Sequence, residues 1–98
     1  MNIQAMMKQA QNLQKDMLNA KKEINAMEFE TKNSFLTMKA NGEKQITSVK
    51  IDIDQLEKED IELLEDMILV AVNDLNKQID KVTEQKMGKY TQGMPGLF

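Results

Sequence analysis

The side chains that most often carry catalytic chemistry are missing from this chain. Its 98 residues include no His and no Cys, so the commonest general bases, nucleophiles and transition-metal ligands are absent. Ser34 and Ser48 are the two serines, and neither lies in a recognisable base or elbow motif. A chain without Cys also has no disulfide framework. The sequence therefore argues against an enzyme, and we expect no cofactor and no small-molecule substrate.

Carboxylates are the one class of possible metal ligand that is concentrated in the chain. Residues 51–66 contain eight acids and one lysine, a formal charge of −7. The acids are Asp52, Asp54, Glu57, Glu59, Asp60, Glu62, Glu65 and Asp66. Their oxygens suit Ca²⁺ or Mg²⁺, but the segment lacks the glycine and the ligand spacing of an EF-hand loop. Because acids also stabilise a helix N-terminus, we interpret the run as a solvated turn and a helix start, and predict no metal site.

Lysines near the N-terminus are spaced to share one face of a helix. Lys8, Lys15 and Lys22 follow one another at intervals of seven residues, and Lys21 lies beside them. Seven residues make about two helical turns, so these lysines line up. Residues 1–22 have a formal charge of +3, and the amides among them can bond phosphates or base edges. The stripe alone fits either a solvated helix face or a face that contacts nucleic acid.

An apolar seam predicts the helix that carries this stripe. Apolar residues recur at alternating intervals of three and four, as in a heptad repeat. The seam residues are Ile3, Met6, Ala10, Leu13, Met17, Ala20, Ile24 and Met27. No Pro or Gly precedes Gly42, so the helix can run for about 25 residues, or about 38 Å. A compact chain of this length has a radius of gyration of about 13 Å. The helix should therefore project from the body, and its seam needs a partner helix, which predicts a dimer.

Beyond this helix the apolar period changes from 3.6 to 2, which predicts β-strands. Residues 27–32 alternate between uncharged and charged side chains, and Asn33-Ser34 forms a turn into a second strand at residues 35–40. Asn41-Gly42 is typical of the two positive-φ positions of a type I′ hairpin turn. The third strand, residues 45–53, is rich in β-branched side chains. The result is a three-stranded antiparallel sheet.

One face of this sheet is apolar and needs a cover. Pairing across the second hairpin places Leu36 and Met38 on the same face as Thr47, Val49 and Ile51. The predicted cover is a second long helix with its own apolar seam. The residues of that seam are Ile61, Leu64, Ile68, Ala71, Val72, Leu75, Ile79 and Val82.

The second helix, predicted over residues 60–87, is apolar over too wide an arc for one contact. Leu63, Met67, Leu69 and Val70 add apolar surface away from its seam. We therefore expect the sheet on one side of this helix and a second subunit on the other. The residues predicted for the dimer interface are Leu36, Met38, Leu63, Met67 and Val70.

The later half of the second helix is polar opposite its seam. Lys77 and Lys81 occupy the face that Leu63 and Val70 occupy earlier. A helix that is apolar on one face only has no need of a second partner. Beyond Asn73 the helix should therefore emerge from the body as an arm.

The remaining features indicate one domain and a tail. Gly88 should end the second helix, and residues 88–98 hold three Gly and one Pro, which predicts a flexible tail. Residues 1–87 should form a single α+β domain in the order α-β-β-β-α. The longest apolar run, residues 67–72, is too short to span a bilayer. Met1–Gln4 lacks the features of a signal peptide, so we expect a cytoplasmic protein with no membrane contact.

Four segments form a series that runs from the first helix to the last residues. They are MMKQAQNLQKDM, ANGEKQITSVKID, DIELLEDMILVAVNDLNKQIDKVTEQKMGKYTQG and MPGLF. Together they resemble the YbaB/EbfC family of bacterial nucleoid-associated proteins, over almost the whole chain and in the same order. The resemblance implies a homodimer with a joined β-sheet centre, helices that project like tweezers, and DNA binding by these helical arms. The chain departs from the family pattern in carrying TKNSF in place of a glycine cluster, Gln55 in place of a proline, and arms with lysine but no arginine.

We therefore predict a nucleoid-associated homodimer that binds double-stranded DNA and influences nucleoid organisation or gene expression. The lysines predicted to contact DNA are Lys8, Lys15, Lys21, Lys22, Lys77 and Lys81. The alternative is a prefoldin-like coiled-coil chaperone or scaffold, for which methionines would supply an adaptable surface. Short helices and a third strand count against that alternative. A catalytic dimer with an acidic metal site is the least favoured reading.

Overall fold

The first helix, α1, spans Ile3–Ala26 of a computed structural model that describes residues 2–91. The Asn2 side-chain oxygen accepts a hydrogen bond from the Ala5 main-chain N–H at 3.3 Å, which satisfies one of the free donors at the helix start. The helix ends where Met27 adopts an extended backbone, with φ −71° and ψ 148°. The long N-terminal helix predicted from the seam is therefore confirmed.

A three-stranded antiparallel sheet follows, in the order β1-β2-β3. The strands are β1 (Glu28–Asn33), β2 (Leu36–Asn41) and β3 (Ile46–Ile51). Leu36 pairs with Ile51, and Met38 pairs with Val49. Directly opposite residues of antiparallel strands point to the same side of a sheet. The common face predicted for these four side chains is therefore confirmed.

The β2–β3 hairpin differs from the type I′ turn predicted at Asn41-Gly42. Positive φ occurs at Lys44, at 65°, and not at Asn41. The Lys44 N–H donates to the Asn41 carbonyl at 3.0 Å, which makes a β-turn followed by a left-handed residue and a bulge. A separate register shift follows along the strands, because Lys39 pairs with Ser48 whereas Ala40 pairs with Ile46. Thr47 is left out of this pairing and does not take its predicted place on the common face.

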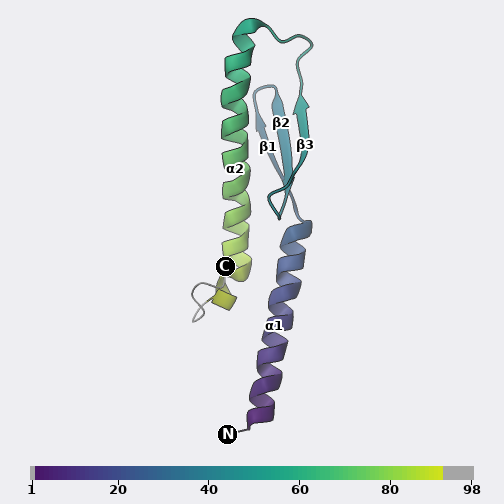
Figure 1. The fold of residues 1–98 in the computed structure, drawn as a ribbon, viewed down its shortest axis with the longest axis vertical. Helices are drawn as coiled ribbons and strands as arrows, with labels where there is room; N and C mark the ends of the chain where they lie inside the picture. The colour runs from purple at the N-terminus through teal and green to yellow at the C-terminus, as the bar shows by residue number, and fades with distance from the viewer. Residues whose placement is uncertain (1, 92–98) are drawn as a thin grey trace.

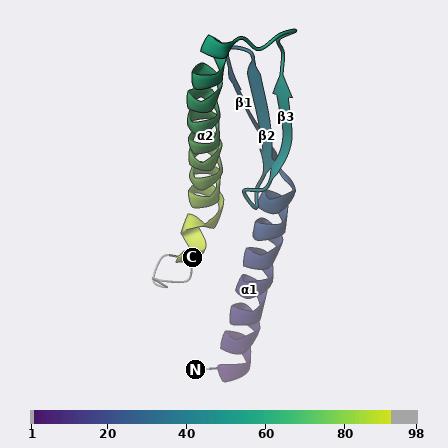
Figure 2. The same ribbon diagram turned by 45° about the horizontal axis from the view of Figure 1, so that its top comes forward.

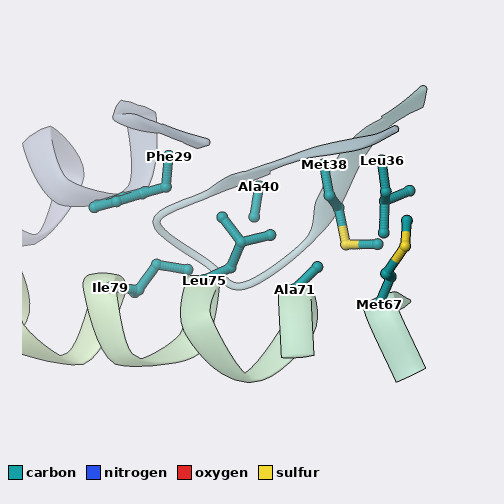
Figure 3. Packing of buried hydrophobic residues seen from close by; sticks show 8 residues of the cluster. All are labelled: Phe29, Leu36, Met38, Ala40, Met67, Ala71, Leu75 and Ile79. Atoms are coloured by element: carbon teal, nitrogen blue, oxygen red, sulfur yellow. The ribbon is translucent and has the colours of Figure 1, made fainter. Parts of the chain in front are cut away.

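The covering helix, α2 (Lys58–Thr91), packs on β1 and β2. Four of its residues recur every four positions and face the sheet across the main core (Figure 3). A row of residues four apart winds slowly round a helix, and this matches the twist of a sheet. The main core consists of Phe29, Leu36, Met38, Ala40, Met67, Ala71, Leu75 and Ile79.

The position of α2 on the sheet corrects two expectations. Met67, assigned to the partner-facing side, is buried in the main core with 3% of its surface exposed. The half of α2 beyond Asn73 does not emerge from the body, because Leu75 and Ile79 are each 1% exposed beneath the sheet. Of the predicted seam, Ala71, Leu75 and Ile79 are buried, but Ile61 and Ile68 are 49% and 38% exposed. The apolar period therefore identified the buried face only in part, and it did not show where along the helix the sheet would lie.

The last turns of α2 form a second, smaller cluster with α1. Ile24 packs against Met87 and Tyr90 there, and Figures 1 and 2 both show this end of α2 beside the sheet-proximal part of α1. The helix continues through Gly88 to Thr91, so the predicted helix end is wrong. The added turn places Tyr90 in the cluster, which explains the continuation. Residues 92–98 of the predicted tail lie outside the described residues.

The resulting molecule is long and thin. It measures 71 × 21 × 14 Å with a radius of gyration of 19.5 Å, against about 13 Å for a compact chain of this length. Most of α1 extends beyond the sheet and α2 (Figure 1). No helix in the described part of the chain is long and apolar enough to cross a membrane.

Candidate nucleic-acid interface

The four lysines predicted on α1 lie on its exposed surface. Lys8, Lys15, Lys21 and Lys22 are all exposed, and no ion pair among residues 2–91 involves them. Ile24 marks the side of α1 that faces α2, and the lysines repeated every seven residues occupy the opposite heptad position. They are about 10.5 Å apart and form a stripe about 21 Å long. Duplex DNA carries about one phosphate charge per 1.7 Å of axis, so such a stripe spans several phosphates.

The two lysines predicted on α2 are exposed but do not lie on a free arm. Ile79, between Lys77 and Lys81, is buried against the sheet. Residues two apart on a helix point about 200° away from each other, so both lysines lie on the outer side of α2. Next to them, Asp80 pairs with Lys44 at 2.8 Å. The structure thus groups the α1 lysines and keeps the α2 pair apart, beside the sheet.

Two further lysines lie closer to α1 than the pair predicted from the sequence. Lys86 and Lys89 line a groove between the helices together with Asp16 and Glu23 of α1. Opposite charges therefore face each other across this groove. Because the second helix was predicted to end at Gly88, Lys86 and Lys89 were not expected on the same helix. On one continuous helix, their spacing of three residues would have indicated a shared face.

The basic and acidic parts of the chain lie at opposite ends of the molecule. The start of α1 is at one end, and the β3–α2 connection is at the other (Figure 1). The long axis measures 71 Å, whereas charges in physiological salt are screened within about 8 Å. The acidic end therefore does not cancel the attraction of the α1 lysines for an anion.

The acidic segment itself builds the start of α2. The Glu57 main-chain N–H donates to the Asp60 carboxylate at 3.0 Å, and Glu59 and Asp60 lie in the first turn. Both features stabilise a helix N-terminus. Among the described residues, no group of three or more acidic side chains is arranged to hold a metal ion.

The residues predicted for the dimer interface fall into two groups. Leu36, Met38 and Met67 are 0%, 3% and 3% exposed within one chain, so they have almost no surface left for a partner. Leu63 and Val70 are 47% and 55% exposed. Of the five, only these two are available to a second subunit without rearrangement.

One of the three strands of the sheet is also open on the apolar face, which sequence reasoning missed. All six residues of β3 are exposed, and Val49 and Ile51 lie on the core-facing side through their pairing with β2. One helix is about 10 Å wide and strands are about 4.8 Å apart, so α2 covers two strands and not three. The width of one helix relative to the strand spacing could have predicted the open strand from the sequence. We call Val49 and Ile51 the open apolar surface. Leu63 and Val70 are further exposed apolar side chains, on α2.

The opposite edge of the sheet is closed by hydrogen bonds from α2. Gln78 Nε2 donates to the Glu30 carbonyl at 3.1 Å and to the Asp74 carboxylate at 2.9 Å. The hydrogen bond from Gln78, followed by one from Thr31, lowers the pKa of Asp74 below its ordinary value. The polar side of α2 thus docks on β1 while β3 stays open.

Comparison with known proteins assigns this arrangement to a family. Residues 1–94 match the YbaB/EbfC DNA-binding family. A nucleoid-associated protein of Lactococcus lactis subsp. cremoris (strain MG1363) is 46% identical over 97 residues, which cover 97% of this chain and 98% of that protein. A nucleoid-associated protein of Enterococcus faecalis (strain ATCC 700802 / V583) is 41% identical over 98 residues, which cover 98% of this chain and 94% of that protein. The chain therefore belongs to the YbaB/EbfC DNA-binding family.

Proposed function

We propose that this protein is a homodimer that binds duplex DNA through the lysine face of α1 and influences nucleoid organisation or gene expression. The observation that carries the proposal is an exposed, unpaired lysine stripe on a helix that projects beyond the body. Its family and the nucleoid-associated relatives support DNA as the partner. The protein would then act by binding alone.

The open apolar surface supports the dimer. Val49 of this surface is 52% exposed, and Val70 of α2 is 55% exposed, although other apolar residues of the same sheet and helix are buried in the main core. Covering apolar surface contributes about 25 cal/mol per Å², so closing this surface against a second copy is favourable. A symmetric pair also doubles the lysine stripes.

The binding we propose is mainly electrostatic. Each phosphate neutralised by a lysine releases condensed counterions, which gives a slope of about −0.9 per contact in a plot of log affinity against log salt. The chain has no Arg, the usual bidentate reader of guanine. Affinity should therefore be modest and similar on duplexes of different sequence.

Titration of a labelled duplex at two salt concentrations tests the proposal. Replacing Lys8, Lys15 and Lys22 with Gln should weaken binding by a similar factor on every duplex and should flatten the salt slope. The matched control removes three other exposed lysines, outside α1. Its substitutions are Lys32→Gln, Lys50→Gln and Lys58→Gln. If the α1 variant keeps the parent's affinity and slope, or if the control loses as much, the arm model is wrong.

The dimer has its own test. Val70→Lys adds a charge at an exposed apolar position of α2 and should weaken the dimer, whereas Lys81→Val, at one of the exposed α2 lysines, should leave it intact. Sedimentation over a range of concentrations distinguishes the two variants. A folded parent that stays monomeric at micromolar concentration contradicts the dimer.

A further inference from the structure

Three segments meet where α1 leaves the body. They are the last turns of α1, the loop between β2 and β3, and the end of α2. Ile24, Met87 and Tyr90 are 3%, 2% and 8% exposed there, and they form a cluster separate from the main core. Within α1, Ile24 is the buried residue. We call this meeting point the arm base.

Beyond the arm base, α1 carries its apolar seam into solvent. Ile3, Met6 and Leu13 are 69%, 53% and 46% exposed, so the described contacts do not hold this part of the helix in place. Lys8 lies sixteen residues before Ile24, a lever of about 24 Å. A tilt of about 10° at the arm base displaces Lys8 by about 4 Å on such a lever. The packing at the base therefore sets the position of the lysine stripe.

The β2–β3 loop acts as a fixed support under the end of α1. A side chain at Gly42 would overlap the Ile24 main-chain carbonyl, so glycine is required here by close approach and not by a turn conformation. The Asn41 side-chain oxygen accepts hydrogen bonds from the Glu43 N–H at 2.9 Å and the Gln45 N–H at 3.1 Å. These bonds hold the loop in the shape that fits beneath the helix.

An ion pair joins the same loop to α2. Lys44 Nζ lies 2.8 Å from the Asp80 carboxylate. Packing of Ile24 on Met87 and Tyr90 joins α1 to α2, and within α2 Lys89 Nζ lies 5.0 Å from the centre of the neighbouring Tyr90 ring. All three segments are thus linked to one another around Ile24.

We propose that Met87 and Tyr90 are positioning residues for DNA binding, which hold the lysine face of α1 in one direction without touching DNA. This inference rests on the proposed function, since it concerns how the same lysines reach phosphates. Binding groups that are held in place before contact lose less conformational freedom on binding. A loose arm base should therefore lower affinity while the number of phosphate contacts stays the same.

The test separates affinity from salt slope. Met87→Ala with Tyr90→Ala should weaken duplex binding about tenfold at every salt concentration, with a slope equal to the parent's. Tyr90→Phe keeps the ring and should bind as the parent does. Met7→Ala truncates an exposed methionine of α1, 57% exposed, and is the matched control that should also leave affinity unchanged. Parental affinity in the double variant overturns the proposal, and so does a flattened slope, which would mean lost lysine contacts.

A second measurement reports arm direction without DNA. Because the chain has no Cys, Gln11→Cys on α1 and Lys32→Cys on β1 accept two spin labels at defined sites, diluted with unlabelled chains. The label distance should have a narrow distribution in the parent and a broad one in the Met87, Tyr90 double variant. A distribution that stays narrow overturns the proposal even if the lysine variants disprove DNA binding by the arm. Met87→Ala alone is the substitute if the double variant does not fold, with a smaller broadening expected.

Discussion

β1 and β3 are the two edge strands of one small sheet, and α2 covers them unequally. On β1, Phe29 is 6% exposed in the main core, and Gln78 donates a hydrogen bond to the Glu30 carbonyl at 3.1 Å. On β3, all six residues are exposed, and Val49 on the core-facing side is 52% exposed. The covering helix is displaced toward β1, so the two edges of the same sheet face different surroundings.

This difference shows how one chain divides its apolar surface. Core-facing residues of β1 and β2 stabilise the fold of a single chain, whereas those of β3 are left exposed. The same division recurs on the helices, because α2 buries Leu75 and Ile79 whereas α1 exposes Ile3. If the protein dimerises as proposed above, we expect folding and association to depend on different apolar residues of the chain.

The largest effect should come from truncating the covered edge. Phe29→Ala is expected to cost about 3–5 kcal/mol of unfolding free energy, since it removes a buried ring and leaves a cavity. Val49→Ala on the open edge should cost less than about 1 kcal/mol in dilute protein, where no partner covers it. Urea unfolding of both variants at the same low concentration makes the comparison. Equal losses would mean that β3 is covered within one chain, and the contrast between the edges would fail.

Dimer association should instead depend on the open edge, β3, and not on the covered edge, β1. Val49→Lys places a charge on the open edge, and an unpaired charge buried at an interface costs about 3 kcal/mol or more. The dissociation constant of the dimer should therefore rise about a hundredfold. Lys50→Gln, the next residue and on the outer side of β3, is the control. Sedimentation should find the control as dimeric as the parent, and a Val49→Lys dimer of parental strength would remove β3 from the interface.

Periodicity was sufficient for the elements and for the face that β2 and β3 share, but not for the whole buried face of α2. The interval of three and four predicted α1, the interval of two predicted the strands, and Leu36 and Met38 share a face with Val49 and Ile51 as expected. Such patterns depend on local geometry, which a sequence displays directly. They do not reveal how far a neighbour extends, and for that reason Met67 was assigned to the wrong surroundings.

The candidate site was harder to predict for a related reason. Predicting the α1 lysine stripe required only that this segment form a helix, and all four lysines are exposed. Predicting the position of Lys86 and Lys89 required knowledge of the contact between α1 and the end of α2, which are far apart in sequence. Gly88 misled because a glycine ends a helix only when tertiary packing offers nothing better. Here the turn that follows it buries Tyr90.

A smaller effect on the unfolding free energy should come from glycine substitutions that change backbone freedom in the β1–β2 turn and in β3. Ser34, in the turn that joins β1 to β2, has φ 54°, where a side chain costs about 1 kcal/mol and glycine does not. Ser34→Gly should therefore raise the unfolding free energy by up to about 1 kcal/mol. Ser48→Gly, the same change within β3, should lower it by about 0.5–1 kcal/mol because glycine weakens a strand. Thermal unfolding gives both signs, and a Ser34→Gly variant less stable than the parent would contradict the strain.

The smallest expected effect is a pH dependence confined to the covered edge. Hydrogen bonds from Gln78 and then Thr31 lower the pKa of Asp74 below 3.8. Folding then favours the ionised carboxylate, so the contribution is complete above that ordinary value and is lost as pH falls through the lower folded value. Because Asp74 remains in contact with solvent, the loss should be slight. Urea unfolding between pH 5 and pH 2 measures how the unfolding free energy falls with pH. This fall should be slightly smaller in Asp74→Asn than in the parent, whereas Asp54→Asn, beyond the open edge, should keep the fall of the parent. Identical acid dependence in the two variants would mean that these hydrogen bonds do not link α2 to β1 in solution.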